Sequence, residues 1–217
     1  MGRRSLRKID PQLDLSRHFF EWSQLAKPIP LSDILPGTGP LELEVGSGKG
    51  LFLENASARF PGHRFLGIEL AGKYARFAAA RLARHGRPNA VVVHGHALDI
   101  LTEGIPDSSA HALHLYFPDP WWKKRHHKRR MMNPDFLAQV LRVLQGGGRF
   151  HFWTDVRDYF ELGLEAVAAF PEFSAPAFPP EEPPQHDRDY RTHFERRTRL
   201  AGQPVYRAQF TKQSPAC

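Results

Sequence analysis

Short apolar runs alternate along the chain with longer stretches whose apolar residues recur at helical spacing. A continuous apolar run of about four to eight residues is typical of a buried strand, whereas apolar positions three and four residues apart predict a helix. Regular alternation of strand and helix predicts an α/β fold with a mostly parallel sheet and helices on both faces. The predicted strands cover residues 41–45, 64–70, 90–96, 111–117, 149–155 and, late in the chain, 204–212, and the predicted helices cover 49–60, 72–85, 97–101, 135–144 and 156–170.

Two parts of the chain lack this alternation. Residues 1–40 are basic and contain prolines, and they are predicted as an N-terminal extension before a single domain at 41–217. Residues 171–189 are rich in prolines and acids, which predicts a surface loop.

The segment LELEVGSGKG places Gly46, Gly48 and Gly50 after a predicted strand and at the start of a predicted helix. Glycines at such a turn let the backbone approach a ligand closely, and the helix N-terminus offers free N–H groups. A glycine triplet is also typical of a tight turn that needs positive φ. Two acids favour a ligand. Glu44 stands just before the first glycine, and Glu69 closes the next strand 19 residues after Gly50, near the ~20-residue spacing at which an acid meets ribose hydroxyls.

The glycine spacing does not fit two phosphate-binding motifs. A dinucleotide fingerprint would have its third glycine where Leu51 stands. A Walker loop would have glycine in place of Leu43, and serine or threonine after Lys49. An acid beside the turn would repel a pyrophosphate, but it suits a ligand that carries an amino group and a sulfonium charge. S-adenosylmethionine is such a ligand, and we expect it as the cofactor.

Asp119 follows the fourth predicted strand, at the edge where open α/β sheets bind their ligands. Pro118 and Pro120 restrict φ on both sides, so we expect the carboxylate to point in one fixed direction. The neighbouring Trp121 is able to stack on a nucleobase, although tryptophan more often packs in a core. The alternative is an ordinary loop acid that caps the following helix. Position and rigidity favour a functional role for Asp119.

The charge of the chain indicates an anionic partner. Its 217 residues include 30 lysines and arginines against 23 aspartates and glutamates, a net charge of +7. Cations gather at the N-terminus and at residues 123–130, KKRHHKRR. Such a run is usually a solvated face or a localisation signal. Here it lies beside the predicted ligand edge, which favours binding of a nucleic-acid phosphate backbone.

The single cysteine, Cys217, allows no intrachain disulfide and no cysteine zinc cluster, which favours a reducing compartment. No run reaches the ~18 apolar residues of a membrane span, and no apolar signal core follows the basic start. We therefore expect a cytoplasmic protein with no membrane partner and no metal.

Several segments together resemble the bacterial tRNA (guanine-N7-)-methyltransferases of the TrmB type. They are LELEVGSGKG, FLGIEL, YFPDPWWKKRHHKRR, WTDVRDYF and THFERRTRLAGQPVYRAQF, in family order over roughly residues 41–210. The P-D-P-W followed by the basic run is highly specific, and T-x-F-E is a second, independent mark. The resemblance implies a class I S-adenosylmethionine-dependent methyltransferase (Rossmann-like) fold with a late antiparallel strand. It also implies methyl transfer to N7 of the variable-loop guanine, position 46, of tRNA.

The resemblance further implies which residues form the site. Asp119 is implied as the catalytic residue, which also faces the cofactor. The family commonly has Asp or Asn where this chain has His96, so the backbone of His96 and Ala97 is expected to meet the adenine. The implied partner is tRNA, and we expect the enzyme to act as a monomer or homodimer. The cofactor side comprises Glu44, Gly46, Gly48, Glu69, His96, Ala97 and Asp119, and the substrate side comprises Lys123, Asp155, Thr192, His193, Phe194 and Glu195.

Guanine N7 carries no proton, so we expect Asp119 to act as an electrostatic and hydrogen-bonding partner rather than as a base. Glu195 is expected to accept from guanine N1–H and N2–H, although Thr192 and Glu195 also have the spacing of a helix capping box. Three alternatives stay open: methylation of another base position or a small molecule, a non-catalytic tRNA-binding protein with this fold, and a dehydrogenase. The last is the least favoured, because the third fingerprint glycine is missing.

Overall fold

The computed structural model of the chain describes residues 6–121, 125, 130–181, 183–184, 186 and 189–214. The predicted alternation from residue 41 onwards is confirmed. The strands are β1 (Phe19–Glu21), β2 (Leu41–Val45), β3 (Arg64–Glu69), β4 (Ala90–His94), β5 (Ala110–Tyr116), β6 (Leu144–Thr154) and β7 (Tyr206–Thr211). The helices are η1 (Trp22–Gln24), α1 (Leu31–Ile34), α2 (Leu51–Arg59), α3 (Gly72–Arg84), α4 (Ala97–Asp99), η2 (Ile100–Gly104), α5 (Pro134–Val143), α6 (Arg157–Ala168) and α7 (His193–Leu200).

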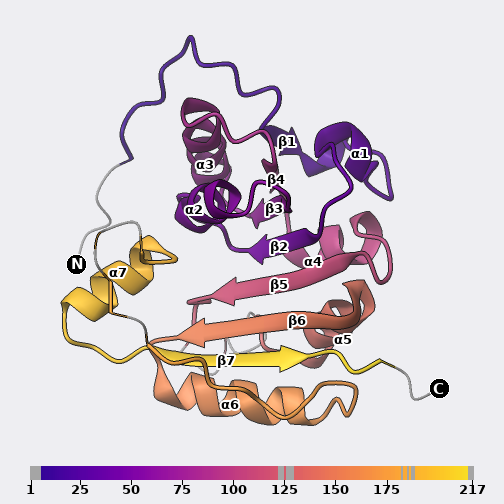
Figure 1. Cartoon of the computed structure of the whole chain (residues 1–217), viewed down its shortest axis with the longest axis vertical. Coiled ribbons are helices and arrows are strands. Elements are labelled where there is room, and N and C mark those ends of the chain that lie inside the picture. Colours follow the sequence, from indigo (N-terminus) through magenta and orange to yellow (C-terminus); the bar gives the residue numbers. More distant parts are fainter. Residues whose placement is uncertain are drawn as a thin grey trace.

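These strands form one sheet in the order β1-β4-β3-β2-β5-β6-β7 (Figure 1). Their pairings are parallel, except that β7 runs antiparallel to β6. The expected fold class, with its late antiparallel strand, is therefore confirmed. From β2 the chain builds outward through β3 and β4 on one side and later through β5 to β7 on the other. Ligands of open α/β sheets bind at the carboxyl ends of the strands where the order reverses in this way, here between β2 and β5.

Helices cover both faces of the sheet, because apolar side chains on each strand alternate between two cores. On β3, Leu66 and Ile68 belong to the core that α5 and α6 help to form. Phe65, which precedes Leu66, belongs to a second core with Phe52 of α2 and Ala78 of α3. Figure 1 shows α2 and α3 at the β3–β4 end of the molecule and α6 beside β7.

Part of the segment that we expected to be an extension, residues 1–40, joins the sheet. β1 pairs in parallel with β4, with Phe19 opposite Val92. Trp22, which follows β1, packs so closely on Gly95 that an added Cβ there would lie 2.7 Å from its side chain. A strand of only three half-buried residues leaves no periodic apolar pattern, which is why the sequence did not reveal β1.

The segment 171–189, expected to be a surface loop, contacts the outer edge of the sheet in its first part. Phe173 pairs with Lys212, and Ala177 pairs with Gln209 of β7. The ring of Phe173 is also buried in the main core. This part of the segment therefore covers the edge strand and shields backbone groups that would otherwise be open to pairing with another chain.

Candidate active site at the carboxyl edge of the sheet

Five of the predicted site residues lie at the carboxyl ends of neighbouring parallel strands. Glu44 is near the end of β2, Glu69 ends β3, and His96 follows β4. Asp119 follows β5 by three residues, and Asp155 directly follows β6. Because all five strands run in the same direction, the topology brings these residues to one edge of the sheet.

The glycine turn between β2 and α2 is built by left-handed backbone. Gly46 has a φ of +79° and Gly50 has a φ of +70°. A Cβ on Gly50 would lie 2.7 Å from the Cβ of Ala78, so this glycine lets α2 approach α3. A Cβ on Gly46 would meet no described atom within 4 Å, so this position borders open space. The turn therefore requires glycine for its own geometry and also leaves room beside Gly46 for a ligand.

Glu69 fixes the shape of this turn. One of its carboxylate oxygens accepts from the Gly48 amide at 2.7 Å, and the other accepts from the Ala71 amide at 2.8 Å. Ala71 precedes the first residue of α3. The carboxylate thus joins the glycine turn to the beginning of the next helix, and its position at the sheet edge depends on both amides.

Glu44 is a buried carboxyl, with 3% of its surface exposed. Burial raises its pKa to about 8, a hydrogen bond with Ser47 opposes this, and the charge of Glu69 adds to the rise. Its Oε2 atom has no hydrogen-bond partner among the described residues. Leaving such an atom unsatisfied costs about 1–3 kcal/mol. A cationic or hydrogen-bond-donating ligand group beside the glycine turn would satisfy it.

The segment around Asp119 is held in a strained backbone conformation. Phe117 has a φ of +51° and Trp121 has a φ of +45°, both in the left-handed region. Each such residue costs on the order of 1–3 kcal/mol and persists only where surrounding contacts impose it. Pro118 and Pro120 lie between them, and Asp119 at the centre is exposed. An exposed carboxylate on a rigid, strained loop is typical of a functional site.

Two hydrogen bonds anchor this segment to the rest of the protein. The amide of Phe117 donates to the carbonyl of Trp153 on β6 at 2.7 Å. The Nε of Arg130 donates to the carbonyl of Pro120 at 2.8 Å, and its guanidinium lies 5.5 Å from the ring centroid of Tyr159. Burial is the main reason that the pKa of Tyr159 is raised, and the charge of Asp119 adds to the rise. Asp119 therefore lies on the side of the edge where α6 begins.

The start of α7 has the N-cap hydrogen bond of the expected capping box, whereas the Glu195 side chain reaches the amide of Arg191 rather than that of Thr192. The hydroxyl of Thr192 accepts from the Glu195 amide at 3.0 Å. The Glu195 side chain is buried, and its Oε2 accepts from the Arg191 amide at 2.7 Å. Its Oε1 lies 3.2 Å from Arg199 Nη1 and 3.4 Å from Arg207 Nη2. Both oxygens of Glu195 are thus engaged by donors of the chain itself.

The other two residues of T-H-F-E point to different neighbours. The ring of Phe194 contacts that of Phe117, with 5.0 Å between centroids. The Nε2 of His193 lies 3.1 Å from Arg81 Nη2 of α3. The structure therefore brings the T-H-F-E segment against the Asp119 loop on one side and against α3 on the other.

Two further predicted site residues are His96, whose side chain is less constrained, and Lys123, which cannot be placed. The side chain of His96 is half-exposed and lies 3.4 Å from Asp99, while its carbonyl accepts from the Ile100 amide at 3.1 Å. Lys123 lies outside the described residues, as does most of the basic run at 123–130. In the part of the chain that the structure describes, no helix is long and apolar enough to cross a membrane.

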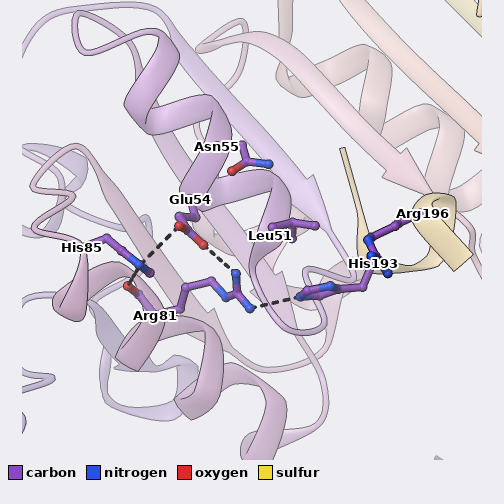
Figure 2. A pocket seen from close by; sticks show the side chains of 7 residues that line it. All are labelled: Leu51, Glu54, Asn55, Arg81, His85, His193 and Arg196. Atoms are coloured by element: carbon purple, nitrogen blue, oxygen red, sulfur yellow. Dashed lines mark hydrogen bonds and ion pairs between the residues drawn. The ribbon is translucent and has the colours of Figure 1, made fainter. Parts of the chain in front are cut away.

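Sequence reasoning missed a second set of polar residues close to this edge. Glu54 of α2 and Arg81 and His85 of α3 line a cavity of about 430 Å³ together with His193 and Arg196 (Figure 2). The helical pattern of α2 and α3 predicts their buried faces. It does not show which polar residues of two helices meet a third helix more than a hundred residues away.

Comparison with known proteins identifies the family. A family model described as "Putative methyltransferase" matches residues 38–208. A tRNA (guanine-N(7)-)-methyltransferase of Rhodopirellula baltica is 47% identical over 220 residues, which cover 99% of this chain and 81% of that protein. The chain belongs to the TrmB family of tRNA (guanine-N7-)-methyltransferases.

Solved structures support the fold of this TrmB-family chain. The 16S rRNA methyltransferase KamB has a TM-score of 0.62 at 15% identity, covering 85% of this chain and 93% of that one. A second structure is that of a 16S rRNA (adenine(1408)-N(1))-methyltransferase mutant from Catenulisporales acidiphilia, crystallised with its cosubstrate SAM. It has a TM-score of 0.57 at 16% identity, and the match covers 82% of this chain and 88% of that one. The TrmB-family chain therefore has the class I methyltransferase fold. Its membership of a family of tRNA methyltransferases shows that it is an enzyme that uses S-adenosylmethionine.

The residues beside the glycine turn fit this cofactor. The unpartnered Oε2 of Glu44 is suited to a cationic amino group, and the space beside Gly46 leaves room for close approach of a ligand. Glu69 lies at the end of the adjacent strand, where an acid meets ribose hydroxyls in related α/β folds. These three features lie along one continuous stretch of the sheet edge.

Proposed function

We propose that the chain transfers a methyl group from S-adenosylmethionine to N7 of the variable-loop guanine, position 46, of tRNA. The observation that carries the proposal is the placement of two acids at the ends of the adjacent strands β2 and β5: Glu44, which is buried and whose Oε2 has no partner among the described residues, and Asp119, which is rigidly held. Membership of the TrmB family supports this choice of substrate. We also propose that the enzyme is cytoplasmic and acts as a monomer or homodimer.

The cofactor side is proposed as follows. When bound, S-adenosylmethionine supplies an electrophilic methyl group. Glu44 would hold the amino group, and Glu69 would hold the ribose hydroxyls. The backbone at His96 and Ala97 would face the adenine, because the His96 side chain is directed to Asp99.

Guanine N7 offers an in-plane lone pair and has no proton to lose, so the protein has no need of a general base there. Orienting two reactants can be worth about 7–11 kcal/mol of a barrier. Asp119 is therefore proposed to accept a hydrogen bond and to stabilise the positive charge that develops on the purine. Its fixed backbone lets it do so without reorganisation during the reaction.

The substrate side is proposed to include Lys123, Asp155 and the T-H-F-E segment of Thr192, His193, Phe194 and Glu195. Phe194 is 38% exposed beside Phe117, so its ring is available to a base near Asp119. Glu195 would accept hydrogen bonds from guanine N1–H and N2–H. These bonds would replace its contacts with Arg199 and Arg207. Cations of the run 123–130 would bind the tRNA backbone.

The test is mass spectrometry of nucleosides from unfractionated tRNA after incubation with the enzyme and S-adenosylmethionine. We expect 7-methylguanosine from the wild type and a loss of about 10²–10³-fold in rate for Asp119→Asn. Asp135→Asn changes an exposed aspartate on α5 and serves as the matched control. A different methylated nucleoside, or full activity of Asp119→Asn, would contradict the assignment.

A further inference from the structure

A cavity of about 430 Å³ lies between α2, α3 and α7, next to the proposed active site. Leu51, at the rim of this cavity, directly follows the glycine turn, and His193 belongs to the T-H-F-E segment. Figure 2 shows Arg81 reaching across the cavity from α3, with Glu54 of α2 at one end of its guanidinium and His193 of α7 at the other. The cavity is thus bordered by elements that also shape the cofactor and substrate sides.

Arg81 is held in one orientation by its neighbours. Its Nη1 lies 2.6 Å from Glu54 Oε2, and its Nη2 lies 3.1 Å from His193 Nε2. Its Nε is buried and has no hydrogen-bond partner among the described residues. His85 lies 3.3 Å from the other oxygen of Glu54 and 3.0 Å from the carbonyl of Arg81. A guanidinium fixed in this way presents its donors without further loss of side-chain freedom.

Positive charge exceeds negative charge around this cavity. Among the described residues that line it, Arg81 and Arg196 stand against a single carboxylate, that of Glu54. Burial and, to a lesser extent, the charges of Arg81, Lys49 and Arg196 together lower the pKa of His193 to about 4, although Glu54 opposes them. His193 is therefore neutral at pH 7, and its Nε2 accepts from Arg81. The surroundings disfavour another cation and favour an anion.

The chemistry of the lining narrows the choice of ligand. S-adenosylmethionine carries positive amino and sulfonium groups, which Arg81 and Arg196 would repel. Among the described residues, no group of three or more His, Cys, Asp or Glu side chains could hold a metal ion. A phosphate group matches arginine donors in both charge and geometry. The cavity also has room for more than a single anion, since a water molecule occupies about 30 Å³.

We propose that this cavity binds a backbone phosphate of the tRNA, next to the nucleotide that is methylated. This inference rests on the proposed function, because it needs a polynucleotide at the Asp119 loop. His193 and Phe194 are consecutive, yet His193 faces the cavity and Phe194 contacts Phe117 beside that loop. A tRNA chain that places its guanine near Asp119 therefore passes the start of α7. There, Arg196 and His193 would contact the next phosphate of the tRNA.

The main experiment compares Arg196→Gln and His193→Gln with Arg84→Gln, which removes an exposed α3 cation that does not line the cavity. We expect both cavity variants to weaken tRNA binding by about tenfold, as for one lost charge-assisted contact. The slope of log K against log salt should fall by about 0.7–0.9 for Arg196→Gln. For Arg196→Gln, the kcat value and the affinity for S-adenosylmethionine should stay unchanged, as should all properties of Arg84→Gln. Unchanged tRNA affinity and salt slope in Arg196→Gln would overturn the proposal.

A second measurement separates a tRNA phosphate from a free anion. The histidine C–H signals of the wild type are followed by NMR during titration with inorganic phosphate and with chloride at equal ionic strength, and His193→Gln identifies the His193 signal. A phosphate-specific shift of that signal, with weaker tRNA binding in the cavity variants, supports the proposal. The same shift with normal tRNA binding in those variants would assign the cavity to a free anion instead and would overturn it. Because these readouts need no turnover, a wild type that makes no 7-methylguanosine would refute the proposed function separately.

Discussion

The carboxylate of Glu69 accepts a hydrogen bond from the Gly48 amide at 2.7 Å, which ties the end of β3 to the glycine turn after β2. The same carboxylate holds the Ala71 amide. One side chain therefore joins the glycine turn to the start of α3 and also places an acid at the proposed cofactor side. Loss of this carboxylate should affect both the stability of the free enzyme and its affinity for the cofactor.

We predict that Glu69→Ala lowers the free energy of unfolding by about 1.5–3 kcal/mol, because a charged acceptor of two amides is lost. Affinity for S-adenosylmethionine should fall at least tenfold. Denaturant unfolding and isothermal titration calorimetry measure the two effects. Glu165→Ala removes an exposed acid from α6 and should change neither. Loss of affinity without loss of stability would show that the Gly48 contact does not hold the turn.

Glu44 should make cofactor binding depend on pH. Burial raises its pKa from 4.5 to about 8, so the free protein carries it largely protonated at pH 7. The neutral form stabilises the fold below pH 4.5, and this contribution is lost as the pH rises through about 8. A cationic amino group prefers the carboxylate, so binding should release a proton and tighten as the pH rises towards 8.

The dissociation constant for S-adenosylmethionine between pH 6 and 9, measured in two buffers with different ionisation enthalpies, checks this prediction. We expect Glu44→Gln to bind more weakly and to lose the proton release. If the variant keeps the same proton release as the wild type, another group is responsible.

The sequence predicts which candidate site residues lie at the sheet edge when they stand at or near the end of a strand. Glu44, Glu69 and Asp119 are of this kind, because a parallel sheet brings the ends of its strands to one edge. The contact of Arg81 with His193 joins residues 112 positions apart, and no periodic pattern in the sequence predicts it. The burial of Glu195 depends in the same way on Arg207 of β7, which the sequence places in a strand but not beside α7.

A buried polar network on the α2 face of the sheet should contribute to acid stability. Glu42 accepts from His114 Nε2 at 2.8 Å and lies 2.7 Å from His63 Nδ1, while Tyr116 contacts the other nitrogen of His114 at 2.8 Å. Burial alone would raise the pKa of Glu42, but hydrogen bonds and charges of His114 and His63 lower it to about 2. Stability from this group is therefore present above pH 4.5 and is lost as the pH falls through about 2.

We predict that Glu42→Gln lowers the free energy of unfolding at pH 7 by about 1–3 kcal/mol. This free energy should also fall less in the variant than in the wild type between pH 5 and pH 2. Urea unfolding across this range provides the measurement. Glu172→Gln, which changes an exposed acid, is the matched control. An identical pH dependence for wild type and Glu42→Gln would remove Glu42 from the acid transition.

The prolines beside Asp119 should matter for the rate rather than for binding. Pro118 and Pro120 restrict a loop whose ends, Phe117 and Trp121, are already in the left-handed region. Replacing Pro120 with alanine frees φ while leaving the carboxylate in place, so Asp119 should spend less time in its productive direction. We predict that Pro120→Ala lowers kcat roughly tenfold, a small part of what orientation can contribute. The KM for tRNA and the affinity for S-adenosylmethionine should change little.

Pro88→Ala, in the exposed loop after α3, controls for the general effect of losing a proline. Single-turnover methyl transfer with saturating tRNA isolates the step, and a rate equal to that of the wild type would show that the anchors at Phe117 and Arg130 fix Asp119 without Pro120.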